Sequence, residues 1–133
     1  MHIKTAYQGQ LRTKALHNMS GNTLLTDAPT DNNGKGETFS PTDLVAAALA
    51  SCMMTIMGIE GQKMGFDMDK LEAETEKVMS VSPRKISKLR IHLKWSDPKG
   101  TSDQRQLLKE KALTCPVALS LSEQLKQEIT FSF

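Results

Sequence analysis

Two cysteines, Cys52 and Cys115, are the residues of this chain best suited to chemistry. They stand too far apart in the sequence for a local metal-binding knuckle or a CxxC redox motif. The two thiols can therefore react with each other only if the fold brings them together. In a reducing compartment such thiols are more often free, catalytic or redox-active than joined in a structural disulfide.

The reactivity of each thiol depends on its surroundings, because the thiolate is the nucleophile. Cys52 lies about three turns after Ser40, a helix-cap residue, where the field of the helix end has faded. A cation from elsewhere must stabilise its thiolate, and Arg12 on an early strand is the first candidate. Cys115 precedes Pro116 at a predicted helix N-terminus, where backbone N–H groups favour an anion. The sequence therefore predicts that Cys115 is the more acidic thiol.

Two plainer interpretations of the cysteines stay open. Free cysteine is among the most buried residue types and packs as a small hydrophobe, so both residues are compatible with a purely structural role. A zinc site would need His17 and His92 beside the thiols, but no pair of these residues has ligand spacing, and strand alternation predicts that His92 faces solvent. We expect no metal.

The long apolar stretch that contains the first cysteine predicts the central element of the fold. Ser40 is a favoured N-cap, Pro41 suits the first helical turn, and Asp43 completes a capping-box pattern. Residues 44–57 are apolar on almost all sides of a helix, as in a helix surrounded by its own domain. The run is shorter than the roughly 18 apolar residues of a membrane span. A core helix over residues 41–64 is expected.

Alternating residues and turn formers predict two groups of strands and two further helices. Strands are expected at residues 3–7, 10–16, 23–26, 71–79, 89–95 and 129–133. A loop is expected at residues 27–37, a helix capped by Thr101 or Ser102 and ending near residue 113, and another helix at 116–126. The strands 71–79 and 89–95 form an antiparallel pair with one apolar and one charged face. The chain is therefore expected to contain both helices and sheets.

Composition limits the partners and the location of the protein. The chain has 133 residues, enough for a single domain over 1–133 with its own core. Its 17 basic and 15 acidic residues are interleaved, which gives no electrostatic reason to expect nucleic acid or a membrane as partner. The first residues lack the apolar segment of a signal peptide, so a cytoplasmic location is expected.

Four segments resemble the OsmC/Ohr family, which contains osmotically inducible protein C and the organic hydroperoxide resistance proteins. They are FSPTDLVAAALASC at 39–52, TCPV at 114–117, GQLRT at 9–13 and TDAP at 26–29. The paired signature, SPTDLVAAALASC followed by CPV, is specific, and the similarity covers nearly the whole chain. The resemblance implies an α+β, OsmC/Ohr-like fold with antiparallel sheets around the long central helix, in an intertwined homodimer.

The resemblance also implies a cysteine-based peroxidase without a cofactor. Cys52 matches the peroxidatic cysteine of the family and Cys115 its resolving cysteine. The Cys52 thiolate would attack an organic hydroperoxide, an alcohol would leave, and the sulfenic acid would condense with Cys115 to a disulfide. A dithiol reductant, dihydrolipoamide in well-studied family members, would reduce it. The implied role is defence against oxidative stress.

The remaining candidate residues follow from this comparison. Family peroxidases pair an N-terminal arginine with a glutamate at the position where this chain has Thr42. Arg12 is the candidate arginine, and Glu37 or Asp43 is its candidate acidic partner. The apolar candidates for substrate binding, which suit an organic hydroperoxide better than hydrogen peroxide, are Leu49, Met53 and Val117. The alternative function is a non-enzymatic OsmC-like protein that binds a small hydrophobic molecule.

Overall fold

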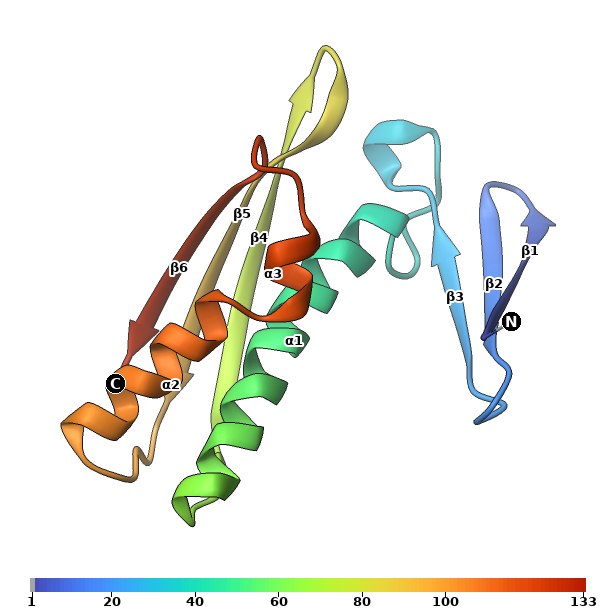
Figure 1. Ribbon diagram of the computed structural model, residues 1–133. Coiled ribbons are helices and arrows are strands. Elements are labelled where there is room, and N and C mark those ends of the chain that lie inside the picture. Colours follow the sequence, from blue (N-terminus) through green and yellow to red (C-terminus); the bar gives the residue numbers. More distant parts are fainter. Residues whose placement is uncertain (1) are drawn as a thin grey trace. The chain divides into compact units, whose positions relative to one another are not determined.

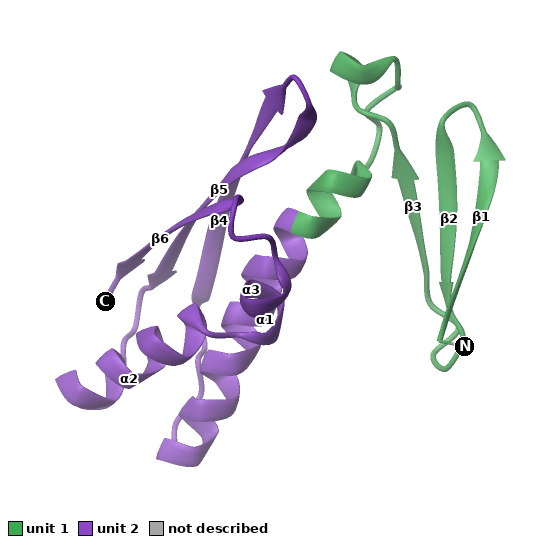
Figure 2. Ribbon diagram, turned by 45° about the horizontal axis from the view of Figure 1, so that its top comes forward, with its two compact units in different colours: residues 1–45 green, residues 46–133 purple. Residues whose placement is uncertain are grey.

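The structure, a computed structural model, describes residues 2–133 in two compact units. Unit 1 comprises residues 1–45 and unit 2 comprises residues 46–133 (Figure 2). The sequence 1–133, expected as one domain, thus contains two parts that are each compact.

Unit 1 is a three-stranded antiparallel sheet followed by a loop. The strands are β1 (Ile3–Gly9), β2 (Arg12–His17) and β3 (Thr23–Asp27), in the order β1-β2-β3 (Figure 1). They confirm the three strands predicted before the long helix. In the register of β2 and β3, Arg12 lies opposite Asp27, so the two side chains share one face of the sheet.

The loop after β3 is held by its own backbone. It contains the short 3₁₀ helix η1 (Thr30–Asn32), and the Gly34 N–H donates to the Pro29 carbonyl at 3.0 Å. A side chain at Gly34 would collide with the Ala28 carbonyl, so the path requires glycine there. The loop predicted over residues 27–37 therefore has a defined shape.

The long helix α1 (Pro41–Met64) has the predicted bounds. The Ser40 hydroxyl accepts from the Asp43 N–H at 3.1 Å, and the Asp43 carboxylate accepts from the Ser40 N–H at 2.9 Å, which confirms the capping box. By length and composition alone α1 could span a membrane, a test that core helices of soluble proteins also pass. Six of its residues are buried, all in unit 2: Ala46, Leu49, Ala50, Met53, Met57 and Gly61.

Unit 2 packs helices on one face of a mixed sheet. Strands β4 (Leu71–Val81) and β5 (Arg84–Trp95) form the predicted antiparallel pair, and β6 (Lys126–Ser132) pairs with β5 in parallel (Figure 1). The expectation of antiparallel sheets is therefore wrong for the pairing of β5 with β6. The reason is the crossover through α2 (Ser102–Leu113) and α3 (Pro116–Ser120), which returns the chain to the start of β5.

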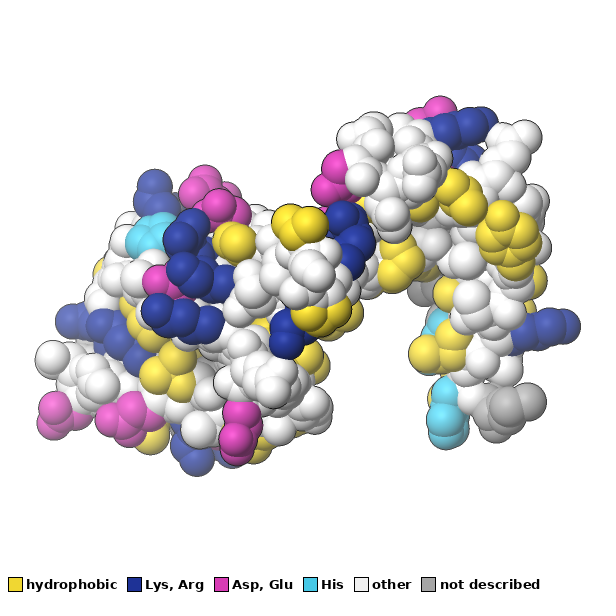
Figure 3. Space-filling view, turned by 90° about the horizontal axis from the view of Figure 1, so that it is seen from above, with side chains coloured by type: hydrophobic (Ala, Val, Ile, Leu, Met, Phe, Trp, Pro, Cys, Tyr) yellow, Lys and Arg dark blue, Asp and Glu magenta, His cyan; other side chains and the backbone are white. Residues whose placement is uncertain are grey.

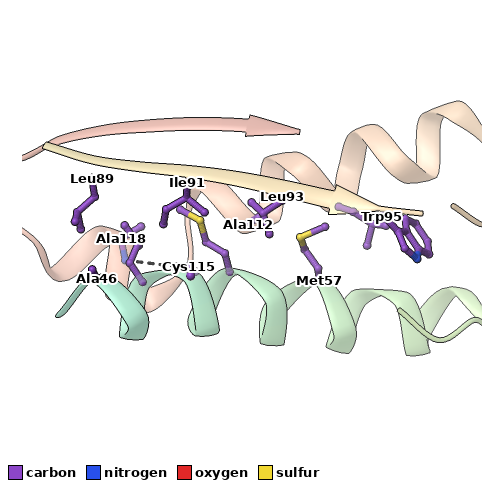
Figure 4. Packing of buried hydrophobic residues seen from close by; sticks show 13 residues of the cluster. Ala46, Met57, Leu89, Ile91, Leu93, Trp95, Ala112, Cys115 and Ala118 are labelled. Atoms are coloured by element: carbon purple, nitrogen blue, oxygen red, sulfur yellow. Dashed lines mark hydrogen bonds between the residues drawn. The ribbon is translucent and has the colours of Figure 1, made fainter. Parts of the chain in front are cut away.

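The core of unit 2 lies between α1 and the inner face of β5 (Figure 4). The predicted inward residues of β5 are at most 2% exposed, and they are Leu89, Ile91, Leu93 and Trp95. They pack with buried residues of α1 and with Leu108 and Ala112 of α2. The alternation of β5 therefore sets which side of the sheet receives the helices.

The outer face of this sheet carries charge. Arg90 pairs with Glu76 at 2.7 Å and with Glu128 at 2.9 Å, which bridges all three strands. Basic and acidic side chains are interspersed on the face of unit 2 seen in Figure 3. The ion pairs of Arg90 lie on the side of the sheet away from the apolar core, as the alternation predicted.

The helix expected over residues 116–126 is wrong in length, whereas α2 and its Thr101 cap are confirmed. Helix α3 ends at Ser120, and Leu121 has extended backbone. The Ser122 hydroxyl then accepts from the Gln124 N–H at 3.1 Å, which offers the backbone a turn in place of a helix. The chain enters β6 at Lys126, earlier than the predicted residue 129, because parallel pairing with β5 begins there.

Candidate functional site

The thiol of Cys115 is buried at the start of α3. Cys115 is 1% exposed and is the N-cap of the helix, and its Sγ accepts from the Ala118 N–H at 3.4 Å (Figure 4). Burial raises the pKa of this thiol, and the neighbouring Cys52 raises it further, while the Ala118 N–H acts in the opposite direction. The prediction of an acidic Cys115 is therefore wrong, because desolvation outweighs the donors of a five-residue helix.

Cys52 belongs to the same apolar cluster as Cys115. Cys52 is half-buried on α1 and packs against the same hydrophobic core. Cys52 is near enough to raise the pKa of the Cys115 thiol, and both cysteines are unbridged. The fold of unit 2 thus brings together two sulfurs that are distant in the sequence, as α1 and the α2–α3 connection lie on the same face of the sheet.

The three apolar candidates differ in their exposure. Leu49 and Met53 are fully buried in the core, and Val117 is partly buried against it. All three belong to the apolar surroundings of the cysteines in unit 2. Of these side chains, Val117 alone keeps solvent-exposed surface.

Arg12 in unit 1 is held by two carboxylates. Its Nε contacts Asp27 Oδ1 at 2.7 Å, its Nη2 contacts Asp27 Oδ2 at 2.9 Å, and Nη2 also contacts Glu37 Oε2 at 3.0 Å. The hydrogen bond from Arg12 holds the pKa of the Asp27 carboxyl below its usual range, despite burial. We call these three residues the Arg12 cluster.

The two acidic residues predicted as partners of Arg12 make different contacts in the structure. Glu37 contacts the guanidinium, whereas Asp43 caps α1 through Ser40. Sequence reasoning missed Asp27, although it lies in the TDAP segment. The signal that could have revealed it is the hairpin register, which sets it opposite Arg12. Arg12 and Cys52 belong to different units, and the activation of Cys52 by Arg12 stays a prediction.

The histidines considered as metal ligands have hydroxyl partners. His17 contacts Ser20 Oγ at 2.6 Å, and His92 contacts the hydroxyls of Thr130 and Ser132, each at 2.8 Å. Within residues 2–133 no group of three or more His, Cys, Asp or Glu side chains is arranged to hold a metal ion.

Comparison with known proteins identifies the family. The sequence profile described as OsmC-like protein matches residues 34–130. A solved structure from Psychrobacter arcticus 273-4, named for an osmotic stress induced and detoxification response, is 43% identical, with a TM-score of 0.94 over 99% of this chain and 96% of that one. No curated protein matches.

More distant solved structures share the fold. The organic hydroperoxide resistance protein OsmC of Legionella pneumophila is 16% identical, with a TM-score of 0.76 over 98% of this chain and 95% of that one. The organic hydroperoxide resistance protein OhrB of Bacillus subtilis is also 16% identical, with a TM-score of 0.68 over 99% and 98% of the two chains.

Proposed function

The chain belongs to the OsmC-like protein family, and we propose that it is a thiol-dependent peroxidase that reduces organic hydroperoxides in oxidative-stress defence. The observation that carries the proposal is that Cys52 and Cys115 share one apolar core, with Cys52 near enough to affect the Cys115 thiol. Two core cysteines without a chemical role have no need to lie near each other, whereas a two-cysteine peroxidase requires it.

The proposed reaction begins at Cys52. Its thiolate attacks the terminal peroxide oxygen, an S–O bond forms, and the O–O bond breaks. The alkoxide leaves and takes a proton to become an alcohol, which leaves Cys52 as a sulfenic acid. The peroxide has then been reduced by two electrons taken from this sulfur.

Cys115 completes the oxidation. Its sulfur attacks the Cys52 sulfenic acid, an S–S bond forms, and hydroxide leaves with the Cys115 proton as water. Because its pKa is raised, Cys115 is a thiol at rest, and its proton passes to the leaving hydroxide as the sulfur attacks. Burial of Cys115 also shields it from direct oxidation.

The apolar surroundings favour an organic substrate. In the proposed site Leu49, Met53 and Val117 form the apolar wall around the cysteines of unit 2. No cofactor takes part, and a small dithiol such as dihydrolipoamide reduces the disulfide. The names of the Legionella and Bacillus proteins agree with this substrate class. We place the reaction in the cytoplasm.

A homodimer is part of the proposal. Along α1 the residues Ser51, Thr55 and Ile59 are exposed and uncharged, at the four-residue spacing of one helix face. In unit 1 the sheet leaves Ile3 62% and Tyr7 67% exposed, with little core of its own. A second copy that covers these surfaces would remove apolar area from water.

Catalytic turnover tests the proposed function. Reduced protein, dihydrolipoamide and cumene hydroperoxide are mixed, and peroxide loss is followed with hydrogen peroxide as the comparison substrate. We expect multiple turnovers and faster consumption of the organic peroxide, both abolished by Cys52→Ser. Consumption no faster than without protein would contradict the peroxidase and favour a non-enzymatic protein that binds a small hydrophobic molecule.

A further inference from the structure

We propose that Gln127 is a positioning residue for the step in which Cys115 resolves the oxidised Cys52. It acts through Ala118 of α3, the residue whose N–H contacts the Cys115 sulfur. The inference rests on the proposed function, in which Cys115 attacks the Cys52 sulfenic acid. All the contacts that carry it lie within unit 2.

Gln127 is a polar side chain on the face of the sheet that carries the core. In the register of β5 and β6 it lies opposite Leu89, which is fully buried on that face. The same face of β6 continues with Ile129 and Phe131, which pack against the core. An amide in such surroundings needs a hydrogen-bond partner, because burying it unpaired costs free energy. The partner is the Ala118 carbonyl, to which Gln127 Nε2 donates at 3.0 Å.

Ala118 joins this contact to the thiol of Cys115. Its carbonyl accepts from Gln127, while its N–H donates to Cys115 Sγ at 3.4 Å (Figure 4). Ala118 is itself buried and packs in the same core as Cys115. A side chain of β6 is therefore linked to the sulfur of Cys115 by two hydrogen bonds that meet at one residue.

Helix α3 depends on contacts from outside itself. With five residues it is far shorter than the roughly 12 residues at which an isolated helix begins to be stable. The carbonyls of its last turn lack partners within the helix, and Gln127 satisfies that of Ala118. The helix ends at Ser120 and the backbone is extended at Leu121, so no further turn supports it. The hydrogen bond from Gln127 therefore helps to fix the position of α3 on the sheet.

The contact at the sulfur has a consequence for the resolving step. In that step the Cys115 sulfur attacks the sulfenic sulfur of Cys52, the S–S bond forms, the S–O bond breaks, and hydroxide leaves with the Cys115 proton as water. Negative charge develops on the attacking sulfur as its proton departs, and the Ala118 N–H lowers the pKa of this thiol against the effect of burial. Displacement of Ala118 would remove that donor and move the sulfur. Loss of the Gln127 amide should therefore slow resolution and leave the attack of Cys52 on peroxide unchanged.

Rapid mixing followed by an acid quench and intact mass separates the two steps. Fully reduced protein receives one equivalent of cumene hydroperoxide, and the reduced, oxygen-adduct and disulfide forms are measured against time. We expect Gln127→Leu to lose the reduced form at the wild-type rate. Its oxygen adduct should convert to the disulfide about fivefold more slowly, the change in rate that one hydrogen bond contributes. Gln127→Met, an unbranched apolar side chain of similar length, should behave in the same way.

A matched control and a measurement without peroxide accompany this test. Gln124→Leu makes the same chemical change at an exposed glutamine that contacts Lys85, and it should alter neither rate. In a Cys52→Ser background, Gln127→Leu should speed the alkylation of Cys115 by iodoacetamide several-fold, because a displaced α3 uncovers the thiol.

The outcomes separate this inference from the proposed function. Equal slowing of both oxidation steps, an unchanged or faster conversion of the oxygen adduct, or unchanged alkylation of Cys115 would overturn the role of Gln127 and leave the peroxidase intact. A wild-type protein that forms neither the oxygen adduct nor the disulfide would contradict the proposed function, and the inference with it.

Discussion

At the scale of single residues, burial decides the character of the two thiols. Cys115 starts a helix, but it is 1% exposed and its helix has only five residues. Desolvation raises its pKa against one backbone donor at 3.4 Å. Cys52 keeps some exposed surface and lies on a long helix. The structure therefore favours Cys52 as the thiol that reagents reach first and Cys115 as a protected thiol.

Alkylation should distinguish the two thiols. Reduced protein treated with limiting iodoacetamide at pH 7.5, roughly one unit below an ordinary thiol pKa, should gain one adduct, on Cys52. Cys52→Ser should then react several-fold more slowly, because the remaining thiol is buried and protonated. Peptide mapping locates the adduct. Equal labelling of both cysteines, or preferential labelling of Cys115, would show that the native site exposes Cys115.

The Asp27 carboxylate should make stability depend on pH in acid. Its folded-state pKa lies below the unfolded value, so its stabilising effect is complete above about pH 4 and falls as the pH drops through the folded pKa. Asp27→Asn should lower the Tm at pH 7 and flatten the loss of Tm between about pH 5 and pH 2. Asp97→Asn, in an exposed turn, serves as the control. An unchanged acid slope in Asp27→Asn would contradict this role.

The candidate residues were predictable from sequence only where a motif contained them. The two cysteines stand in distinctive segments, and Glu37 follows a turn-rich stretch close to the helix cap. Asp27 was not predicted as a site residue, because its contact with Arg12 depends on the register between β2 and β3. Residue types alone do not reveal that register. The raised pKa of Cys115 was not predicted, because the burial of this thiol depends on how α3 packs against the rest of unit 2.

At the scale of elements, caps and alternation set most of the fold. The capping boxes at Ser40 and Thr101 fixed the starts of α1 and α2, and alternation fixed the inner face of β5. The helix after Cys115 was overestimated because the Ser122 turn competes with helical hydrogen bonds. The parallel pairing of β6 depends on the crossover, a non-local feature that no short pattern specifies.

The inner face of β5 should dominate the stability of unit 2. Leu93 is fully buried between α1 and the sheet, so Leu93→Ala should lower the free energy of unfolding by about 2–5 kcal/mol. Chemical denaturation measures this loss. Leu119→Ala removes the same atoms from a side chain that is 72% exposed, and it should change stability by no more than about 0.5 kcal/mol. Equal losses for both variants would contradict the assignment of the core.

At the scale of the whole molecule, an exposed and uncharged face of α1 favours a second copy. Helix α1 buries six residues within unit 2 and leaves the uncharged face of Ser51, Thr55 and Ile59 exposed. Light scattering during size exclusion should give twice the 14.7 kDa chain mass. Ile59→Lys should shift the protein to monomer, whereas Leu113→Lys, on a similarly exposed residue of α2, should leave the dimer intact. A monomeric wild type would contradict the dimer.

The central claim is that Cys52 and Cys115 form a peroxidatic pair, and the mass of the intact protein tests it most directly. Fully reduced protein receives one equivalent of cumene hydroperoxide and is measured within seconds, beside Cys52→Ser and Cys115→Ser. We predict rapid loss of two hydrogens in the wild type, no rapid change in Cys52→Ser, and an added oxygen in Cys115→Ser. A wild-type mass that changes only through slow methionine oxidation would contradict the account.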